Sequence, residues 1–244
     1  MPFQSLQELL LFRPPPIPEV ISQGILYEGT KLVIFGEPKT YKSLIAEQLA
    51  FCIAVGTPWL GFHTLQQRVA FTQAEVPRWL FRKRTVAMAS NITIPPNMLF
   101  FDTRRDLKLD RTTDLKEFEK DIARIAPKVL FLDPMYKYIS GPEEPVVLRF
   151  ADNLDYLIDK YHLTVVLVHH SRKPRATMSG SVIDQGGSEL RGPIIEMWAD
   201  SIIRVKGDLM VDERTLDFEL RHADTLIYPV DVRLNRRRLW LERI

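Results

Sequence analysis

One eight-residue segment combines the residue types and the spacing that phosphate binding needs. Gly36, Lys42 and Ser43 occupy fixed positions of the pattern GxxxxGK[ST], and Tyr41 stands where that pattern has its second glycine. The apolar stretch before the segment predicts a buried strand, and the stretch after it predicts a helix. In such a strand–loop–helix unit, backbone N–H groups and the positive helix N-terminus bind phosphate oxygens. The segment therefore predicts a nucleotide-binding loop, and a chance turn is the alternative.

Within this loop, Lys42 would reach the terminal phosphates and the Ser43 hydroxyl would hold Mg²⁺. The side chain of Tyr41 must point away from the phosphates, across the nucleotide or into solvent. If its backbone needs a positive φ, a tyrosine there costs about 1–2 kcal/mol. The substitution leaves the lysine and the hydroxyl in place, so we interpret the loop as a functional variant. The residues predicted to bind the nucleotide are Gly36, Glu37, Pro38, Lys39, Thr40, Tyr41, Lys42, Ser43 and Leu44.

Two carboxylates follow predicted strands and could act on the same nucleotide. Asp133 comes directly after the apolar stretch 128–132, where an aspartate can hold Mg²⁺ through water. An aspartate that opens a turn before a proline is the alternative reading of this position. Glu75 follows the stretch 68–72 and could orient and deprotonate an attacking water. From the residues alone, a surface glutamate in a loop is an equal alternative.

The elements that would position these residues alternate along the chain. Strands are predicted for 31–35, 68–72, 98–101, 128–132 and 164–169, and helices for 43–55, 78–90, 113–125 and 145–161. Alternating helices and apolar strands predict an α/β fold whose mostly parallel sheet is covered by helices on both faces. The segments 199–206, 214–222, 226–234 and 238–243 are predicted to form antiparallel hairpins that extend one edge. In such sheets, ligands bind at the carboxyl ends of the strands.

The chain is predicted to hold one domain and an N-terminal arm. Residues 6–12 predict a short amphipathic helix. The three prolines at 14–16 end this helix and predict a stiff extended segment after it. We place the arm at 1–23 and the domain at 24–244.

The order of these motifs is similar to that of the RecA-like ATPases, and within them it most resembles the RepA hexameric helicase branch. The shared pieces are G-x-P-K-[ST] at Gly36, A-E-x-P at Glu75, the apolar strand that ends in Asp133, His-His-x-x-Lys from His169, and Arg-Gly at Arg191. The resemblance covers about residues 24–206. It implies a RecA-type core, a hexameric ring of identical subunits, and hydrolysis of ATP with Mg²⁺ between neighbours.

The resemblance also implies roles for single residues. Glu75 matches the catalytic base and Asp133 the metal aspartate, while His169 and His170 match a sensor of the γ-phosphate. Metal binding or strand-end packing is the alternative for the two histidines, and no third metal ligand has a suitable spacing. Arg191 matches an arginine finger that reaches the neighbour's nucleotide, which is worth about 10³-fold or more in rate; a surface arginine paired with Glu189 is the alternative. Lys206 is a weaker candidate for the same role.

Two loops could contact single-stranded DNA, because in RecA-like rings their positions line the central channel. The loop 135–145 carries Tyr136, Lys137 and Tyr138, and the loop 171–182 carries Arg172, Lys173 and Arg175. Cations on a flexible loop bind phosphates without reading sequence, and aromatic rings stack on bases. Solvated surface loops are the alternative.

Composition excludes several classes of protein. With 45% hydrophobic and 26% charged residues and a net charge of +2, the chain is neither disordered nor a wholly cationic nucleic-acid binder. A single cysteine, no secretory leader and no apolar run of about 18 residues predict a cytoplasmic protein without a membrane segment. We predict an ATP-driven DNA helicase or translocase. A slow nucleotide-dependent clamp and a scaffold with a degenerate pocket are the alternatives.

Overall fold

The computed structural model describes residues 3–13, 16–90, 92–170 and 193–244. Its main feature is a nine-stranded sheet with the order β11-β10-β9-β8-β3-β7-β6-β4-β5. Neighbouring strands from β5 to β8 run parallel, and those from β8 to β11 run antiparallel. The expected mostly parallel sheet with an antiparallel extension at one edge is therefore confirmed.

The segment 199–206 is predicted among the antiparallel hairpins, but it pairs in parallel with residues 32–36. The parallel part therefore consists of this strand and the strands that the sequence predicts from their apolar runs. Their bounds are β3 (Lys31–Gly36), β4 (Val69–Gln73), β5 (Leu99–Asp102), β6 (Val129–Asp133), β7 (Thr164–His170) and β8 (Ser201–Lys206). The central strands β4 and β6 are buried at every residue. Burial on both faces explains why these strands read as continuous apolar runs instead of alternating ones.

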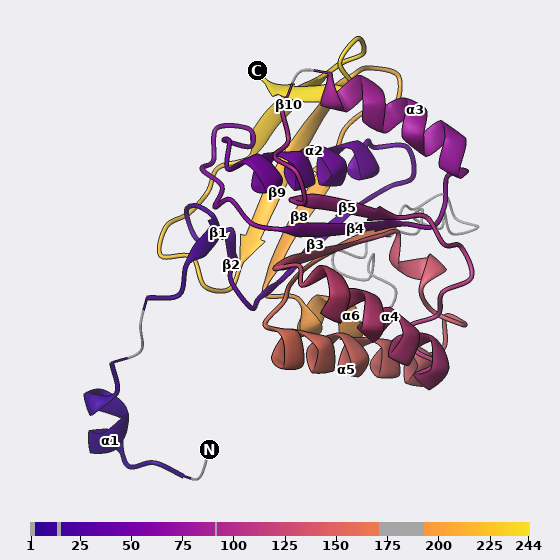
Figure 1. Ribbon diagram of the computed structural model, residues 1–244. Coiled ribbons are helices and arrows are strands. Elements are labelled where there is room, and N and C mark those ends of the chain that lie inside the picture. The colour runs from indigo at the N-terminus through magenta and orange to yellow at the C-terminus, as the bar shows by residue number, and fades with distance from the viewer. Residues whose placement is uncertain (1–2, 14–15, 91, 171–192) are drawn as a thin grey trace, which may run out of the picture.

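Helices cover the two faces of the sheet (Figure 1). On one face lie α2 (Lys42–Val55) and α3 (Arg78–Ala89), and on the other lie α4 (Thr112–Ile125), α5 (Glu144–Tyr161) and α6 (Pro193–Trp198). Each face has its own apolar core: Phe71 and Phe131 belong to the cluster beneath α2, and Val33 and Leu130 to the cluster above α5. Adjacent strand residues point to opposite faces, which divides the side chains between the two cores.

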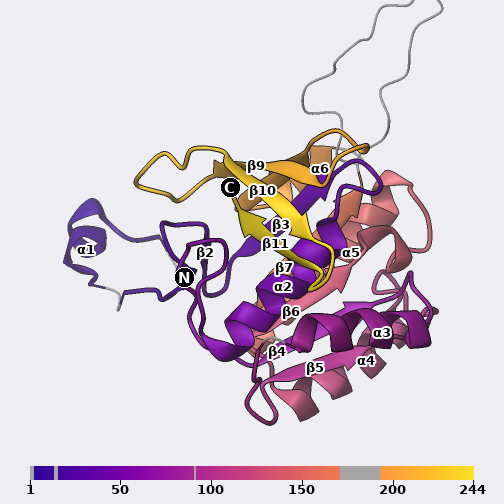
Figure 2. The same cartoon turned by 90° about the horizontal axis from the view of Figure 1, so that it is seen from above.

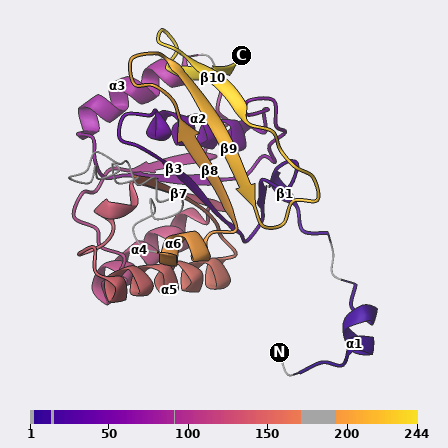
Figure 3. The same cartoon turned by 180° about the vertical axis from the view of Figure 1, so that it is seen from behind.

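The C-terminal strands β9 (Glu213–Leu220), β10 (Val230–Asn235) and β11 (Trp240–Arg243) continue the sheet beyond β8. Figures 2 and 3 show that they curl toward the face that carries α2. The Gln48 side chain on α2 donates to the Leu241 carbonyl at 3.0 Å and accepts from the Leu241 N–H at 2.8 Å. This contact ties the C-terminal end of the chain to the helix that follows the phosphate loop.

Two parts of the structure differ from the sequence prediction. A small hairpin of β1 (Glu19–Ile21) and β2 (Leu26–Tyr27) precedes β3, and its strands are too short to give a periodic signal. The predicted loop at 135–145 begins with a short 3₁₀ helix (Met135–Lys137), and α5 already starts at Glu144. Tyr138 is fully buried there, with 0% exposure, so the suggestion that it stacks on a nucleic-acid base is wrong.

The N-terminal helix α1 (Leu6–Leu11) buries none of its residues. Leu6, Leu9, Leu10 and Leu11 are all exposed, and the helix lies apart from the sheet (Figures 1 and 3). Its N-terminus is well capped, since Ser5 and Glu8 form reciprocal side-chain-to-backbone hydrogen bonds. Within the described residues, no helix combines the length and the apolar character needed to cross a membrane.

Candidate nucleotide-binding site

The phosphate loop joins the carboxyl end of β3 to the first turn of α2. It leaves the sheet at Gly36, where an added Cβ would lie 2.5 Å from the Val205 carbonyl oxygen on β8. No larger residue fits this close approach, so the first glycine of the motif is required by packing against β8. Thr40 is buried, and its hydroxyl donates to the Glu37 carbonyl at 2.8 Å, closing the loop.

Tyr41 caps α2 with a left-handed backbone (φ 69°, ψ 12°). The positive φ that the sequence analysis considered is therefore present at the position where the motif usually has glycine. The side chain is partly buried and points toward the residues that follow β8. Its hydroxyl donates to Asp212 at 2.8 Å, and its ring lies 4.3 Å from the Arg214 guanidinium carbon.

Lys42 is 3% exposed and points back into the loop. Its ammonium group donates to the Glu37 carbonyl and lies 3.4 Å from the Thr40 hydroxyl. Burial lowers the pKa of Lys42 to about 8, although Asp133, Glu75 and Glu37 oppose that shift. The lysine therefore carries its charge at neutral pH in a cradle of loop oxygens, which is where an anionic phosphate would be attracted.

Ser43, the residue after this lysine, is hydrogen-bonded to Asp133. The Ser43 hydroxyl donates to Asp133 Oδ1 at 3.0 Å, and Asp133 is 1% exposed. Burial raises the pKa of Asp133 to about 6. Its Oδ2 is buried without a hydrogen-bond partner among the described residues. A buried carboxylate oxygen beside a hydroxyl is a donor set that suits Mg²⁺, so these two residues fit the predicted ion.

Glu75 lies at the mouth of the same site, just after β4. Its Oε1 accepts a hydrogen bond from the Tyr136 hydroxyl at 2.8 Å, and its Oε2 lies 4.0 Å from His170 Nε2. Arg105 donates to the Glu75 backbone carbonyl at 2.9 Å. Tyr136 and His170 thus contact the two carboxylate oxygens, and Arg105 fixes the backbone. The side chain stays partly exposed, as a base that takes a proton from water requires.

The two histidines at the end of β7 have different surroundings. His170 pairs with Gly36 across the parallel strands and faces Glu75 and the Tyr136 ring, whose centroid is 5.6 Å away. His169 is 2% exposed, and its ring centroid lies 6.2 Å from that of Phe35. Of the two candidate sensors, His170 is therefore the one beside the phosphate loop and Glu75.

The remaining predicted site residues are spread over several environments. Glu37, Pro38 and Lys39 are exposed along the loop, and Leu44 packs against the core. Lys137 is half-buried, and its ammonium group lies 5.2 Å from the Tyr136 ring centroid. Lys206 forms an ion pair with Asp217 at 2.7 Å. The predicted positions Arg172, Lys173, Arg175 and Arg191 lie outside the described residues.

Sequence reasoning missed a buried ion pair next to this site. Glu47 on α2 is fully buried and lies 2.7 Å from Arg84 on α3, and the Thr85 hydroxyl donates to it at 2.6 Å. The same Arg84 charge lowers the pKa of Asp133, against the larger effect of burial. The sequence signal was a glutamate within a mostly apolar helix, where its burial is costly unless it is paired.

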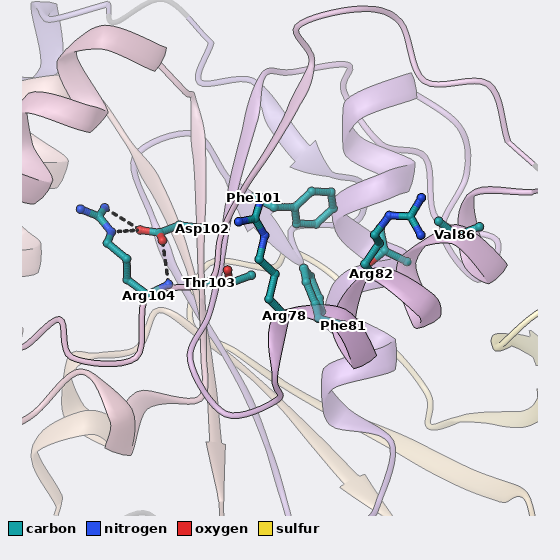
Figure 4. A pocket seen from close by; sticks show the side chains of 9 residues that line it. Arg78, Phe81, Arg82, Val86, Phe101, Asp102, Thr103 and Arg104 are labelled. Atoms are coloured by element: carbon teal, nitrogen blue, oxygen red, sulfur yellow. Dashed lines mark hydrogen bonds and ion pairs between the residues drawn. The ribbon is translucent and has the colours of Figure 1, made fainter.

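A cavity of about 540 Å³ lies elsewhere, between α3 and the end of β5 (Figure 4). Its wall contains Phe81, Phe101 and Val86, with Arg78 and Arg82 on the helix side. None of the residues that line it belongs to the phosphate loop. Val86 and Phe101, which line the cavity, are exposed, so its wall combines apolar side chains with the cations of α3.

The fold and the site together define a class: a RecA-like core whose phosphate loop, metal aspartate and strand-end glutamate meet at the carboxyl edge of a parallel sheet. A family model described as an AAA domain matches residues 2–176. The chain belongs to this family, and it is a P-loop ATPase of RecA-like fold. A comparison with curated proteins gave no match.

Two solved structures illustrate the similarity of the fold. A KaiC-like protein of the hyperthermophilic archaeon Pyrococcus horikoshii OT3 superposes with a TM-score of 0.66 at 14% identity, over 94% of this chain and 100% of that one. The second is an ATPase domain, which superposes with a TM-score of 0.69 at 10% identity, over 93% of this chain and 92% of that one. At these identities the similarity establishes the fold alone.

Proposed function

We propose that the chain is the subunit of a ring-forming motor that hydrolyses ATP to move along or unwind DNA, acting as a helicase or a single-strand translocase. The observation that carries the proposal is the meeting of Lys42, Ser43, Asp133, Glu75 and His170 at one edge of the sheet. A scaffold with a degenerate pocket would have no reason to bury a charged lysine beside an aspartate.

Each residue has a distinct part in the proposed reaction. Lys42 would turn from the Glu37 carbonyl to the terminal phosphates and neutralise their charge. Ser43 and Asp133 would hold Mg²⁺, which supplies further neutralisation of the phosphate oxygens. Glu75, held by Tyr136, would orient the attacking water and accept its proton. His170, which lies between Glu75 and the loop, would respond to the γ-phosphate.

Assembly into a hexameric ring, with Arg191 reaching the neighbour's nucleotide, is part of the proposal. Its support is the exposed leucine surface of α1, which none of the described residues of the domain covers. Isolated helices of this length are unstable in water, and exposed apolar faces mark contacts between chains. A neighbouring subunit would supply the apolar contact that keeps such a helix folded.

We expect replacement of Leu9 and Leu10 by glutamate to lower the solution mass of the assembly measured with ATP and Mg²⁺. The physical reason is the cost of placing charges in an apolar contact, about 2 kcal/mol or more for each buried site. Gln7→Glu is the matched control, since it adds a negative charge to the same helix at a polar position. An unchanged mass for the double variant would refute a role of α1 in assembly.

The motor function is tested by ATP turnover with and without single-stranded DNA. We expect DNA to stimulate turnover several-fold. We also expect neutralisation of Arg172, Lys173 and Arg175 to weaken DNA binding. The salt dependence of binding should become flatter, because fewer counterions are released. Neutralising Lys116, Lys120 and Arg149, which are exposed on α4 and α5, gives a control with the same change in charge. Turnover that is indifferent to DNA would favour the alternative, a slow nucleotide-dependent clamp that controls partner binding.

A further inference from the structure

We propose that Tyr41 is a positioning residue that anchors the phosphate loop to the C-terminal strands, so that Asp212 and Arg214 help to set nucleotide affinity. The inference rests on the proposed nucleotide-binding function and adds to it a support for the loop from a distant part of the chain. A tyrosine in the glycine position of the motif can make such side-chain contacts, and a glycine cannot.

The backbone at Tyr41 needs a compensating interaction. Its φ of 69° lies in the left-handed region, which is unfavourable for a residue with a side chain. Lys39, two residues earlier, also has a positive φ, of 71°. A loop with two non-glycine residues in this region persists only when its surroundings hold it in place.

Two contacts from the C-terminal strands hold the tyrosine side chain. The hydroxyl donates to Asp212 Oδ1 at 2.8 Å, and the Arg214 guanidinium carbon lies 4.3 Å from the ring centroid. A cation at this distance over an aromatic ring is attracted by the negative ring face.

The two partners of Tyr41 are themselves fixed. Asp212 accepts from both Nε and Nη2 of Arg236, at 2.6 and 2.8 Å. Arg214 is 2% exposed, and its Nη1 donates to the carbonyls of Asp208 and Val211 at 2.8 and 2.7 Å. The anchor is therefore a network that spans the β8–β9 loop and the turn before β11, and it does not depend on a single flexible side chain.

The loop is consequently held at both of its ends by β8 and the segment that follows it. At the start, Gly36 lies against the Val205 carbonyl on β8, and at the end, Tyr41 is bound to Asp212 and Arg214. Fixing the loop before the nucleotide arrives lowers the ordering cost that binding must overcome. Weakening the anchor should therefore raise the dissociation constant and the KM, while kcat changes little because Lys42, Asp133 and Glu75 are untouched.

The test is a double-mutant cycle on the hydrogen bond, with ADP and Mg²⁺ titrated by calorimetry. Tyr41→Phe and Asp212→Ala should each weaken ADP binding by about fivefold, the effect expected for one hydrogen bond. The double variant should bind no more weakly than the poorer single variant, because both remove the same interaction. Asp212→Asn keeps an acceptor oxygen and should restore most of the affinity. Tyr41→Gly, which relieves the backbone and removes the anchor, should still bind more weakly than the wild type.

Thr215→Val is the matched control, since Thr215 donates to Asp231 at 2.6 Å on the same strands without touching the loop. It should leave ADP affinity unchanged. Equal loss of affinity in the control, fully additive single variants, or single variants that bind like the wild type would each overturn the proposal. A wild-type chain that binds no ADP would instead refute the proposed function, so the two failures are distinguishable.

Discussion

Replacing Lys42 by alanine or methionine is expected to reduce ATP turnover by at least about 10²-fold, the loss seen when a single preorganised charge-stabilising group is removed. Lys42 is the cation buried in the loop, where its ammonium group lies among the oxygens of Glu37 and Thr40. Without it, the loop would offer no side-chain cation to the developing negative charge on the transferred phosphate. The measurement is steady-state release of phosphate at saturating ATP.

Unfolding experiments separate this effect from loss of structure. Because burial lowers the pKa of Lys42, its charge is unfavourable in the nucleotide-free protein, and methionine of similar length should leave the unfolding temperature unchanged or raise it. Lys120→Ala, on the exposed face of α4, is the control and should change neither quantity. Retained turnover in the Lys42→Met protein would refute the assignment of the phosphate loop.

Glu75→Gln is expected to lower turnover by about 10²–10⁴-fold, the usual contribution of a general base. The amide keeps the size of the side chain and can still accept the Tyr136 hydrogen bond, but it cannot take a proton from water. Binding of ATP should stay within about twofold of the wild type, since the change is made at the mouth of the site and leaves the loop intact. Single-turnover hydrolysis and nucleotide titration measure the two quantities separately.

Two further variants separate loss of the base from loss of its positioning group and from a simple change in charge. Tyr136→Phe should cause a smaller loss than Glu75→Gln, because it removes a group that positions the carboxylate and leaves the base itself. Glu117→Gln, an exposed glutamate on α4, controls for the change in charge. Normal turnover in the Glu75→Gln protein would assign the base to another residue.

Most of the parallel core could be predicted from local patterns. The stretch 128–132 is apolar throughout after its first residue, and it forms β6, shifted by one residue so that Asp133 ends the strand. Helix α4 was predicted to start at 113 and starts at Thr112. Such segments are predictable because burial on one face imposes a period and burial on both faces gives a continuous apolar run, and a short window of sequence contains either signal. The hairpin of β1 and β2 escaped prediction, since two or three residues cannot display a period.

The residue types of the site and their meeting at one edge of the sheet could be predicted from the sequence, but the individual contacts between them could not. Lys42, Ser43, Asp133 and Glu75 were chosen because each follows a strand or begins a helix, and parallel strands bring their carboxyl ends to one edge. The choice between His169 and His170 required the structure, because neighbours on a strand point to opposite faces and the sequence alone does not say which face carries Glu75.

The sequence by itself therefore determined the phosphate-loop chemistry and the order of strands and helices, because both depend on residues close together in the chain. Only the tertiary structure decided what Tyr41 contacts. Its partner Asp212 lies 171 positions away, and the two meet because β8 pairs with β3 and β9 folds back beside it. Contacts of that separation follow from strand order and register, which a local sequence pattern does not encode.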